Sequence, residues 1–214
     1  MPDQNPTPRR RRWIFLTVGA AAVVVLVVAV IGITRYFSSP VDMHGNHVQA
    51  DTVAPPVASS SAVPVVGDGR FIAPSVGLNV PLGALNAVGG VIEPPGFTSA
   101  YWIRNEGVSL QDAAKGTVFV VMHSLRNGGV GPGNYLIDVQ RQTARIALGA
   151  TIEVDGVTYR VTGTSAIRKP DIAYASAIWT NTPDRLVVIT CLQRPQGGPS
   201  LQNMVIEARR VENR

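Results

Sequence analysis

Apolar residues fill one long uncharged run near the start of the chain. The run, WIFLTVGAAAVVVLVVAVIGIT, occupies residues 13–34. A helix of about 20 such residues, rising ~1.5 Å per residue, spans a hydrocarbon core of ~30 Å. The alternative is a signal peptide, whose apolar core usually has ~7–15 residues and ends at a small-residue cleavage site. Because this run is longer and Arg35 follows it, we predict an uncleaved transmembrane anchor.

The charges beside this run predict its orientation. Residues 1–12 are polar and end in the cluster Arg9-Arg10-Arg11-Arg12. Basic residues flanking a membrane span stay on the cytoplasmic side. We therefore expect a basic cytoplasmic tail and a single-pass protein of the cell membrane, whose later residues are extracellular.

Residues 35–69 show no sustained hydrophobic period. Segments such as VAPPVASSS offer little to bury, which is typical of an extended, flexible linker. His44 and His47 lie in this part of the chain. No cysteine or carboxylate set completes a metal site with them, so no metal is predicted.

From residue 70 to residue 214 short apolar runs alternate with turn signals. Asp155-Gly156 is the strongest hairpin signal, and only short stretches such as 110–115 could be helical. This recurrence predicts one mainly β domain, either a barrel or a sandwich of about eight strands. The predicted strands cover residues 71–73, 78–82, 91–93, 117–122, 135–139, 151–154, 158–161, 185–191 and 204–208.

Composition adds little about partners. The net charge is +5, but four of the arginines belong to the cluster before the anchor. No basic face with interleaved aromatic residues occurs in the rest of the chain, so nucleic-acid binding is not expected. We also predict no cofactor.

The chain's only cysteine, Cys191, ends the predicted strand 185–191. The following residues, 192–200, contain two prolines and two adjacent glycines, which predict a loop. One cysteine excludes an internal disulfide, and in an exported protein it is a reactive thiol or an intermolecular partner. The alternative is a buried cysteine that acts as a small apolar residue. The position at a strand end favours a reactive thiol.

His123 is the only histidine of residues 70–214, and it follows the apolar run 118–122. If this strand and the cysteine strand are neighbours and run the same way, both side chains reach one rim of the domain. A cysteine nucleophile needs a nearby base or cation to form its thiolate, and imidazole is a common choice. The positions of His123 and Cys191 in the sequence do not exclude the alternative that the two strand ends lie apart and have no common function.

Residues Ile189-Thr190-Cys191 resemble the Thr-Leu-x-Thr-Cys signature of sortases, the membrane-anchored cysteine transpeptidases of Gram-positive bacteria. The resemblance covers about residues 70–211 and includes a strand followed by histidine about 70 residues before the cysteine. Residues 148–159 are similar to a Gly-Asp-x-Ile-x-Val…Tyr stretch of that family. The segments at residues 72–82 and 178–186 look most like its actinobacterial class F branch.

The resemblance implies an eight-stranded sortase-type β-barrel with short helices and a defined chemistry. Cys191 would attack a backbone carbonyl of a C-terminal sorting signal of the Leu-Pro-x-Thr-Gly type on a surface protein, forming a thioacyl-enzyme. An amine acceptor, such as a cell-wall precursor or a pilin lysine, would then resolve it. His123 would serve as general acid and base, and Thr190 could hydrogen-bond the substrate.

The sequence departs from the family's pattern at an arginine. Sortases carry this residue near the start of the last strand, where this chain has Leu201-Gln202-Asn203. Arg194 is the nearest substitute and our predicted third catalytic residue, although it could equally be a solvated loop charge. Gln202 or Asn203 could supply a neutral donor. A second departure, Met122 in place of the usual glycine, predicts a narrower cleft beside His123.

Two other functions stay open at this point. The missing arginine would suit a sortase-like barrel that is catalytically weak or inactive and serves as a binding or assembly module. An ordinary cysteine peptidase, in which water resolves the acyl-enzyme, is the other alternative.

Overall fold

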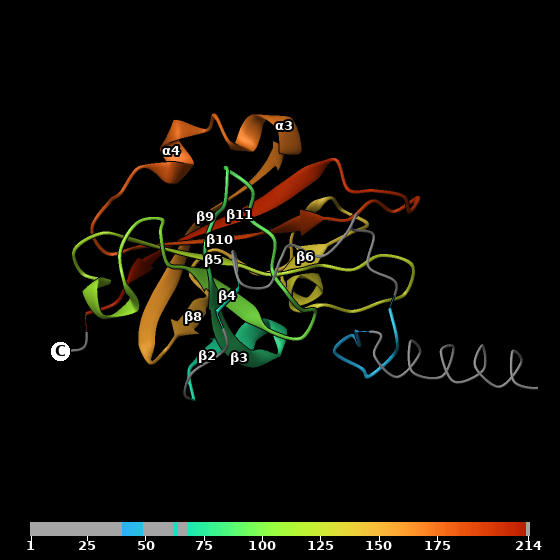
Figure 1. The fold of residues 1–214 in the computed structure, drawn as a ribbon, viewed down its shortest axis with the longest axis horizontal. Helices are drawn as coiled ribbons and strands as arrows, with labels where there is room; N and C mark the ends of the chain where they lie inside the picture. The colour runs from blue at the N-terminus through green and yellow to red at the C-terminus, as the bar shows by residue number, and fades with distance from the viewer. Residues whose placement is uncertain (1–39, 49–61, 64–67, 213–214) are drawn as a thin grey trace, which may run out of the picture. The chain divides into compact units, whose positions relative to one another are not determined.

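The computed structural model describes residues 40–48, 62–63 and 68–212 (Figure 1). The predicted basic tail and transmembrane anchor, and most of the predicted linker, lie outside these residues. Within the described ranges, none of the helices has the length and apolar character needed to cross a bilayer.

Most of the regular secondary structure in the described residues is β-strand, and the helices are single turns. The strands are β1 (Ala62–Val63), β2 (Arg70–Ala73), β3 (Leu78–Leu85), β4 (Ala100–Ile103), β5 (Thr117–Val121), β6 (Ile137–Asp138), β7 (Thr143–Ala144), β8 (Thr151–Val154), β9 (Val157–Arg168), β10 (Arg185–Leu192) and β11 (Gln202–Arg210). The helices are η1 (Pro74–Val76), η2 (Leu110–Asp112), η3 (Pro132–Tyr135), α3 (Lys169–Ile172) and α4 (Ser176–Trp179).

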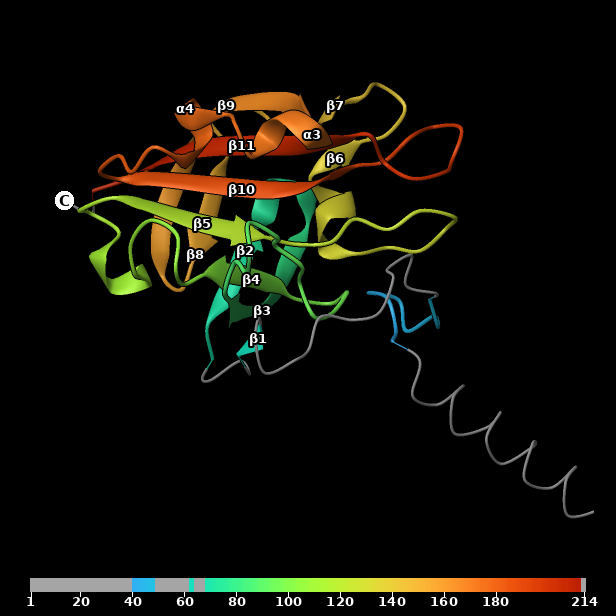
Figure 2. The same cartoon turned by 45° about the horizontal axis from the view of Figure 1, so that its top comes forward.

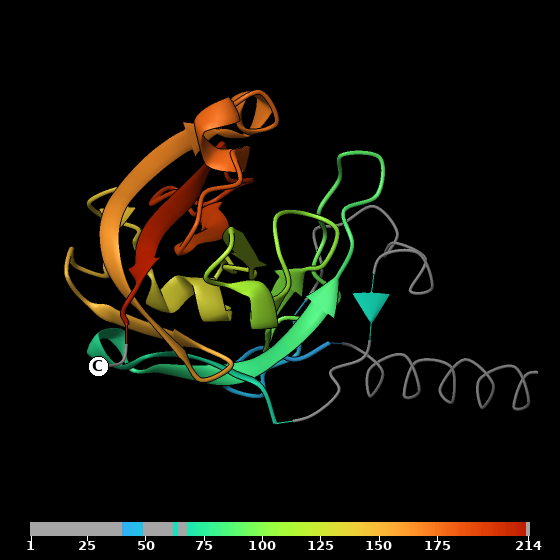
Figure 3. The same cartoon turned by 90° about the vertical axis from the view of Figure 1, so that its left-hand side faces the viewer.

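Eight of these strands form a closed ring. Their order is β3-β2-β8-β9-β11-β10-β5-β4, and a parallel pairing of β4 with β3 closes the circle. Figure 3 shows the strands curving around a common interior. The mainly β fold with about eight strands is therefore confirmed, and the architecture is the barrel rather than the sandwich.

The predicted hairpin at Asp155-Gly156 is confirmed. Val154 pairs with Val157, so these two residues form the whole turn between β8 and β9. Both have positive φ angles, 49° for Asp155 and 78° for Gly156, as the favoured two-residue hairpin turn requires.

One strand prediction is wrong, and one strand was not predicted. Residues 91–93 contribute only an isolated bridge between Val88 and Val91. Pro94 and Pro95 follow directly and carry no N–H group to extend a ladder. Strand β4 was not predicted, because its four residues show too short a pattern to be distinguished from a loop.

Strands β5 and β10 are buried on both faces, which explains their continuous apolar runs. Alternate residues face the barrel interior, among them Val120 and Val188. The intervening residues, such as Val121 and Ile189, face outward into a second apolar cluster. The connection that carries α3 and α4 covers this outer face (Figure 2), where Trp179 packs on the cluster.

Part of the predicted linker belongs to the folded unit. Residues 40–48, here named the N-terminal turn, bond to the loop after β5 through Met43 N–H and the Val130 carbonyl, at 2.8 Å. β1, also inside the predicted linker, pairs with β3. The prediction of a flexible linker up to residue 69 is therefore wrong for these residues, because backbone hydrogen bonds attach them to the barrel domain.

Candidate functional site

The parallel pairing of β5 with β10 brings the predicted nucleophile and base to one place. Val121 is in register with Ile189, so His123 and Cys191 each stand two residues beyond the last pair, at the same end. Both side chains line one cavity of about 740 Å³. Figure 2 shows β10 between β5 and β11. The expectation that the two strands are neighbours and run the same way is confirmed.

The backbone around the thiol is held by a small polar network. Ser124, the residue after the histidine, donates its hydroxyl hydrogen to the Cys191 carbonyl oxygen. Gln193 donates from Nε2 to the Ser124 carbonyl at 2.8 Å and to its hydroxyl oxygen at 3.0 Å. These bonds tie the end of β10 to the end of β5. The Cys191 side chain is half-buried and carries a free thiol.

His123 is oriented by the loop before β4. Its Nε2 lies 2.9 Å from the Pro94 carbonyl oxygen, and its ring meets that of Phe97 edge-on with centroids 4.9 Å apart. A carbonyl oxygen only accepts, so Nε2 carries the hydrogen and Nδ1 has the free lone pair. Nδ1 is therefore the nitrogen that can take a proton from a thiol. In the described structure no hydrogen bond joins His123 to Cys191.

Burial lowers the pKa of His123. The bond to the Pro94 carbonyl acts in the opposite direction, and the positive charge of Lys169 lowers the pKa further. His123 is therefore a neutral imidazole at neutral pH, able to act as a base.

Two glycines press against the backbone of His123. Gly133 donates its N–H to the His123 carbonyl oxygen at 2.8 Å. A Cβ atom at Gly131 would lie 2.6 Å from that oxygen, and one at Gly133 would overlap the Thr190 hydroxyl. The approach of η3 to both strand ends therefore requires glycine at these positions.

Replacing Gly133 by alanine should disturb both strand ends. We expect the free energy of unfolding to fall by about 1–3 kcal/mol, the usual cost of overpacking, and acyl transfer to slow as His123 shifts. Denaturant unfolding of Gly133→Ala measures the first effect. Gly163→Ala is the matched control, because a Cβ there would meet only the Glu207 Cβ atom, at 3.9 Å. Equal stability of the two variants would contradict this packing.

Thr190 does not line the cavity. Side chains alternate along a strand, so Thr190 points to the opposite face from Cys191. Its side chain is 2% exposed and its hydroxyl lies against Gly133. The geometry favours a packing role, and the predicted contact of Thr190 with substrate stays a prediction.

Arg194 also lies off the cavity that holds Cys191 and His123. Its guanidinium folds over the turn at Gly197-Gly198, where a Cβ at Gly198 would lie 3.6 Å from Nη1. The arginines and lysines that do line the cavity are Arg126 and Lys169. Met122, which was expected to narrow the cleft, is buried inside the barrel and does not line it either.

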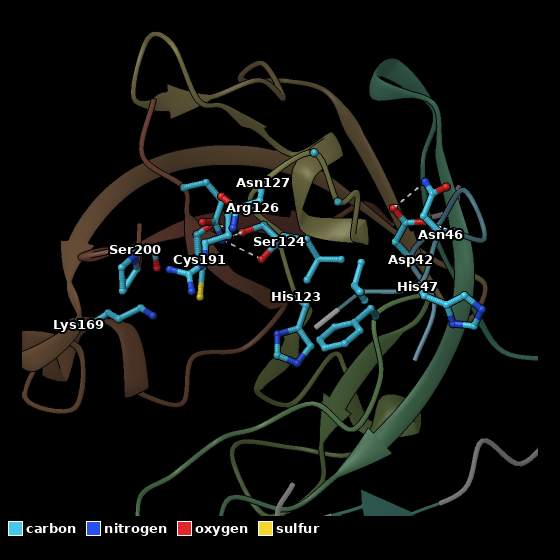
Figure 4. A pocket seen from close by; sticks show the side chains of 17 residues that line it. Asp42, Asn46, His47, His123, Ser124, Arg126, Asn127, Lys169, Cys191 and Ser200 are labelled. Atoms are coloured by element: carbon cyan, nitrogen blue, oxygen red, sulfur yellow. Dashed lines mark hydrogen bonds between the residues drawn. The ribbon is translucent and has the colours of Figure 1, made fainter. Parts of the chain in front are cut away.

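The N-terminal turn forms the wall of the cavity beyond His123, as Figure 4 shows. Asp42, Asn46, His47 and Val48 contribute to this wall, although sequence reasoning placed all four in a linker. Asp42 is the residue that builds the turn. Its carboxylate accepts from the backbone N–H groups of His44, Asn46 and Val130, at 2.9, 2.9 and 3.1 Å.

The pKa of Asp42 reflects these bonds. Burial raises it, but the N–H donors of Asn46, Val130 and His44 together outweigh burial and lower it to about 2. A carboxyl group whose pKa is lower in the folded than in the unfolded protein stabilises the fold above its unfolded pKa. This contribution is therefore complete above about pH 4 and is lost as the pH falls towards 2.

Replacing Asp42 by alanine should release the N-terminal turn. Hydrogen bonds to a charged group contribute about 1.5–3 kcal/mol, so we expect the Asn46 and Val130 amides to exchange at least about tenfold faster. Hydrogen exchange measured by NMR at pH 6 checks this. Asp138→Ala is the control, because Asp138 accepts from Gln140 and Arg141 in another turn. Unchanged exchange at Val130 in Asp42→Ala would refute the attachment.

Among the described residues, no group of three or more His, Cys, Asp and Glu side chains is arranged to hold a metal ion.

Comparison with known proteins gives likenesses of overall structure. No family model and no curated protein sequence matches the chain. Sortase A from Listeria monocytogenes is 20% identical over 67% of this chain and 86% of its own, with a TM-score of 0.47. A lid mutant of sortase A from Corynebacterium diphtheriae is 14% identical over 71% and 72%, with a TM-score of 0.49. Sortase C-1 from Actinomyces oris is 11% identical over 68% and 73%, with a TM-score of 0.47. At these values the likenesses carry no information about the chemistry at Cys191.

Proposed function

We propose that this protein is a sortase-type cysteine transpeptidase that acts through Cys191 and His123. The observation that carries the proposal is the parallel register of β5 and β10, which sets the only cysteine and the domain's only histidine at one cavity. A half-exposed thiol, a neutral imidazole with a free Nδ1 and a cationic side chain are the parts that thiol acyl transfer needs.

The first half of the reaction forms a thioester. The thiol proton of Cys191 passes to Nδ1 of His123, and the thiolate attacks a backbone carbonyl carbon of the substrate. The carbonyl electron pair moves to oxygen and gives a tetrahedral oxyanion. When the C=O bond reforms, the C–N bond breaks and the imidazolium returns its proton to the leaving amine.

The second half uses an incoming amine. Its nitrogen attacks the thioester carbon and gives its proton to His123. Collapse of this intermediate breaks the C–S bond, and the departing thiolate takes the proton back from the imidazolium. One amine has replaced another on the acyl group, and no oxidant or cofactor is consumed.

The substrate and setting follow from the sequence resemblance. We extend the proposal to a C-terminal sorting signal of the Leu-Pro-x-Thr-Gly type on surface proteins, and to an amine acceptor such as a cell-wall precursor or a pilin lysine. The apolar run at 13–34 supports an anchor with the barrel on the extracellular side of the membrane. The segments at residues 72–82 and 178–186 support membership of the class F branch of actinobacterial sortases.

One observation favours a second function, the binding or assembly module. His123 is bonded to Pro94, and no hydrogen bond reaches it from Cys191 in the described structure. A barrel in which Nδ1 of His123 does not reach the Cys191 sulfur would bind a sorting signal without cleaving it. The two functions differ in whether the bound peptide forms a thioester with the Cys191 sulfur.

Intact-mass spectrometry tests the proposal. The full-length protein is incubated with a Leu-Pro-x-Thr-Gly peptide, and with the same residues in scrambled order as a control. We expect a thioester adduct on Cys191 with the first peptide only, and an amide product when a free amine is added. Binding without adduct or cleavage would support the module, and release of only the free acid in the presence of amine would support a peptidase.

A further inference from the structure

We propose that Lys169 supplies the positive charge at the reacting centre, a role for which Arg194 was the sequence-based candidate. This inference rests on the proposed function, since it assigns a further residue to the same site. The lysine ammonium would stabilise the Cys191 thiolate and the oxyanion that forms on the substrate, with the Ser200 hydroxyl as a second donor.

The sheet register places Ile167, two residues before Lys169, on the face of the thiol. Cys191 on β10 is directly opposite Asn203 on β11, and Asn203 is opposite Ile167 on β9. These side chains share one face of the sheet, and Lys169 follows two residues after Ile167. Its backbone N–H donates to the Leu201 carbonyl at 3.0 Å, which fixes the start of α3 against the loop after β10.

Lys169 and His123 stand on opposite sides of the Cys191 sulfur in Figure 4. All three residues line the same cavity. This arrangement separates the base from the cation, so that an acyl carbon attached to the sulfur would lie between a proton acceptor and a positive charge.

Ser200 provides an independent sign that this side of the cavity receives a ligand. Its side chain lines the cavity and is 8% exposed. Its buried hydroxyl has no hydrogen-bond partner in the described structure. A buried hydroxyl without a partner costs free energy, so a substrate carbonyl that accepts from it would recover that cost.

Asp42 and His47, two of the other titratable residues at the cavity, are less suited to the role. The Asp42 carboxylate is occupied by the N–H donors of its own turn and of Val130. His47 lies with Asp42 on the side of the N-terminal turn, whereas Arg126 lies near Cys191 in Figure 4 and is a second cation at the cavity. In the described structure Lys169 forms no salt bridge, whereas the neighbouring Arg168 pairs with Asp171 at 2.6 Å.

A charge at this point has two consequences. It attracts the negatively charged sulfur once the thiol proton has passed to His123. It also acts at the oxyanion, where loss of one donor typically slows a reaction by about 10²–10³. Burial is the larger cause of the lowered pKa of His123, and the charge of Lys169 acts in the same direction.

The test compares Lys169→Met, which removes the charge at similar length, with Lys169→Arg, which keeps it. Arg168→Met is the matched control, because Arg168 is the adjacent cation and lies off the cavity. Two measurements need no substrate: the pH profile of Cys191 alkylation by iodoacetamide, and the His123 pKa from NMR titration. A third is the rate of adduct formation with the Leu-Pro-x-Thr-Gly peptide.

For Lys169→Met we expect alkylation at pH 7 about three- to tenfold slower, a higher His123 pKa and adduct formation slower by about tenfold or more. Lys169→Arg should recover most of each effect, and Arg168→Met should match the wild type. A Lys169→Met variant with wild-type alkylation and peptide rates would overturn the inference. The wild type could form no peptide adduct while Lys169→Met still changes the alkylation rate of Cys191. That result would support the electrostatic effect of Lys169 on Cys191 and would refute the proposed function.

Discussion

Replacement of Cys191 by alanine is expected to abolish adduct formation and to lower peptide turnover by more than about 10³-fold. The sulfur is the atom to which the acyl group is attached, so no other side chain at the cavity can take its place. The fold should be retained, because the bond from Ser124 reaches the Cys191 backbone carbonyl rather than its side chain. Intact-mass spectrometry and peptide chromatography measure both effects.

Cys191→Ser is the informative companion variant. A hydroxyl is far harder to deprotonate than a thiol, so this variant should also form no adduct while binding the peptide as the wild type does. Cleavage by Cys191→Ala at a rate within tenfold of the wild type would place the nucleophile elsewhere and refute the role of Cys191.

Replacement of His123 by glutamine should slow acyl transfer by about 10²–10⁴, the usual contribution of a general acid and base. Glutamine can still donate to the Pro94 carbonyl, so the loop before β4 should keep its place. The measurement is the single-turnover rate of adduct formation. His44→Gln is the matched control, because His44 is exposed and does not line the cavity.

The pH dependence should identify the same residue. Because the pKa of His123 is lowered, the imidazole stays neutral down to a pH below its usual value of about 6.5. Its contribution to the free energy of unfolding is complete above about pH 6.5 and is lost as the pH falls through the lowered pKa. His123→Gln should remove this loss, and an unchanged pH profile of stability would contradict the buried, neutral state.

The ends of the strands could be predicted from sequence, because apolar runs stop where turn residues begin. This is why Cys191 and His123 were both placed at strand ends. Their adjacency could only be supposed, since the pairing of β5 with β10 joins distant parts of the chain and no local pattern encodes it. The structure supplies that pairing, and the site follows from it.

Other features were missed for different reasons. The period of two along β10 already implied that Thr190 and Cys191 face opposite ways, so its burial could have been foreseen. Asp42 stands three residues before Gly45-Asn46 and could have been identified as an aspartate that bonds its own turn. Its bond to Val130, however, depends on tertiary structure. Lys169 could not be identified from the sequence, because it begins α3, just after β9, and lies far along the chain from both catalytic strands.

The bond between Ser124 and Cys191 joins residues 67 positions apart. Four strands, β6 to β9, lie between these residues in the sequence. The two catalytic strands run parallel, so the intervening chain must return to the same end of the barrel before they can pair. Contacts of such separation form late and slowly in folding. Until then the cysteine is an ordinary thiol with no base beside it. The appearance of rapid alkylation at Cys191 during refolding would therefore report closure of the barrel, with the active site serving as its own folding probe.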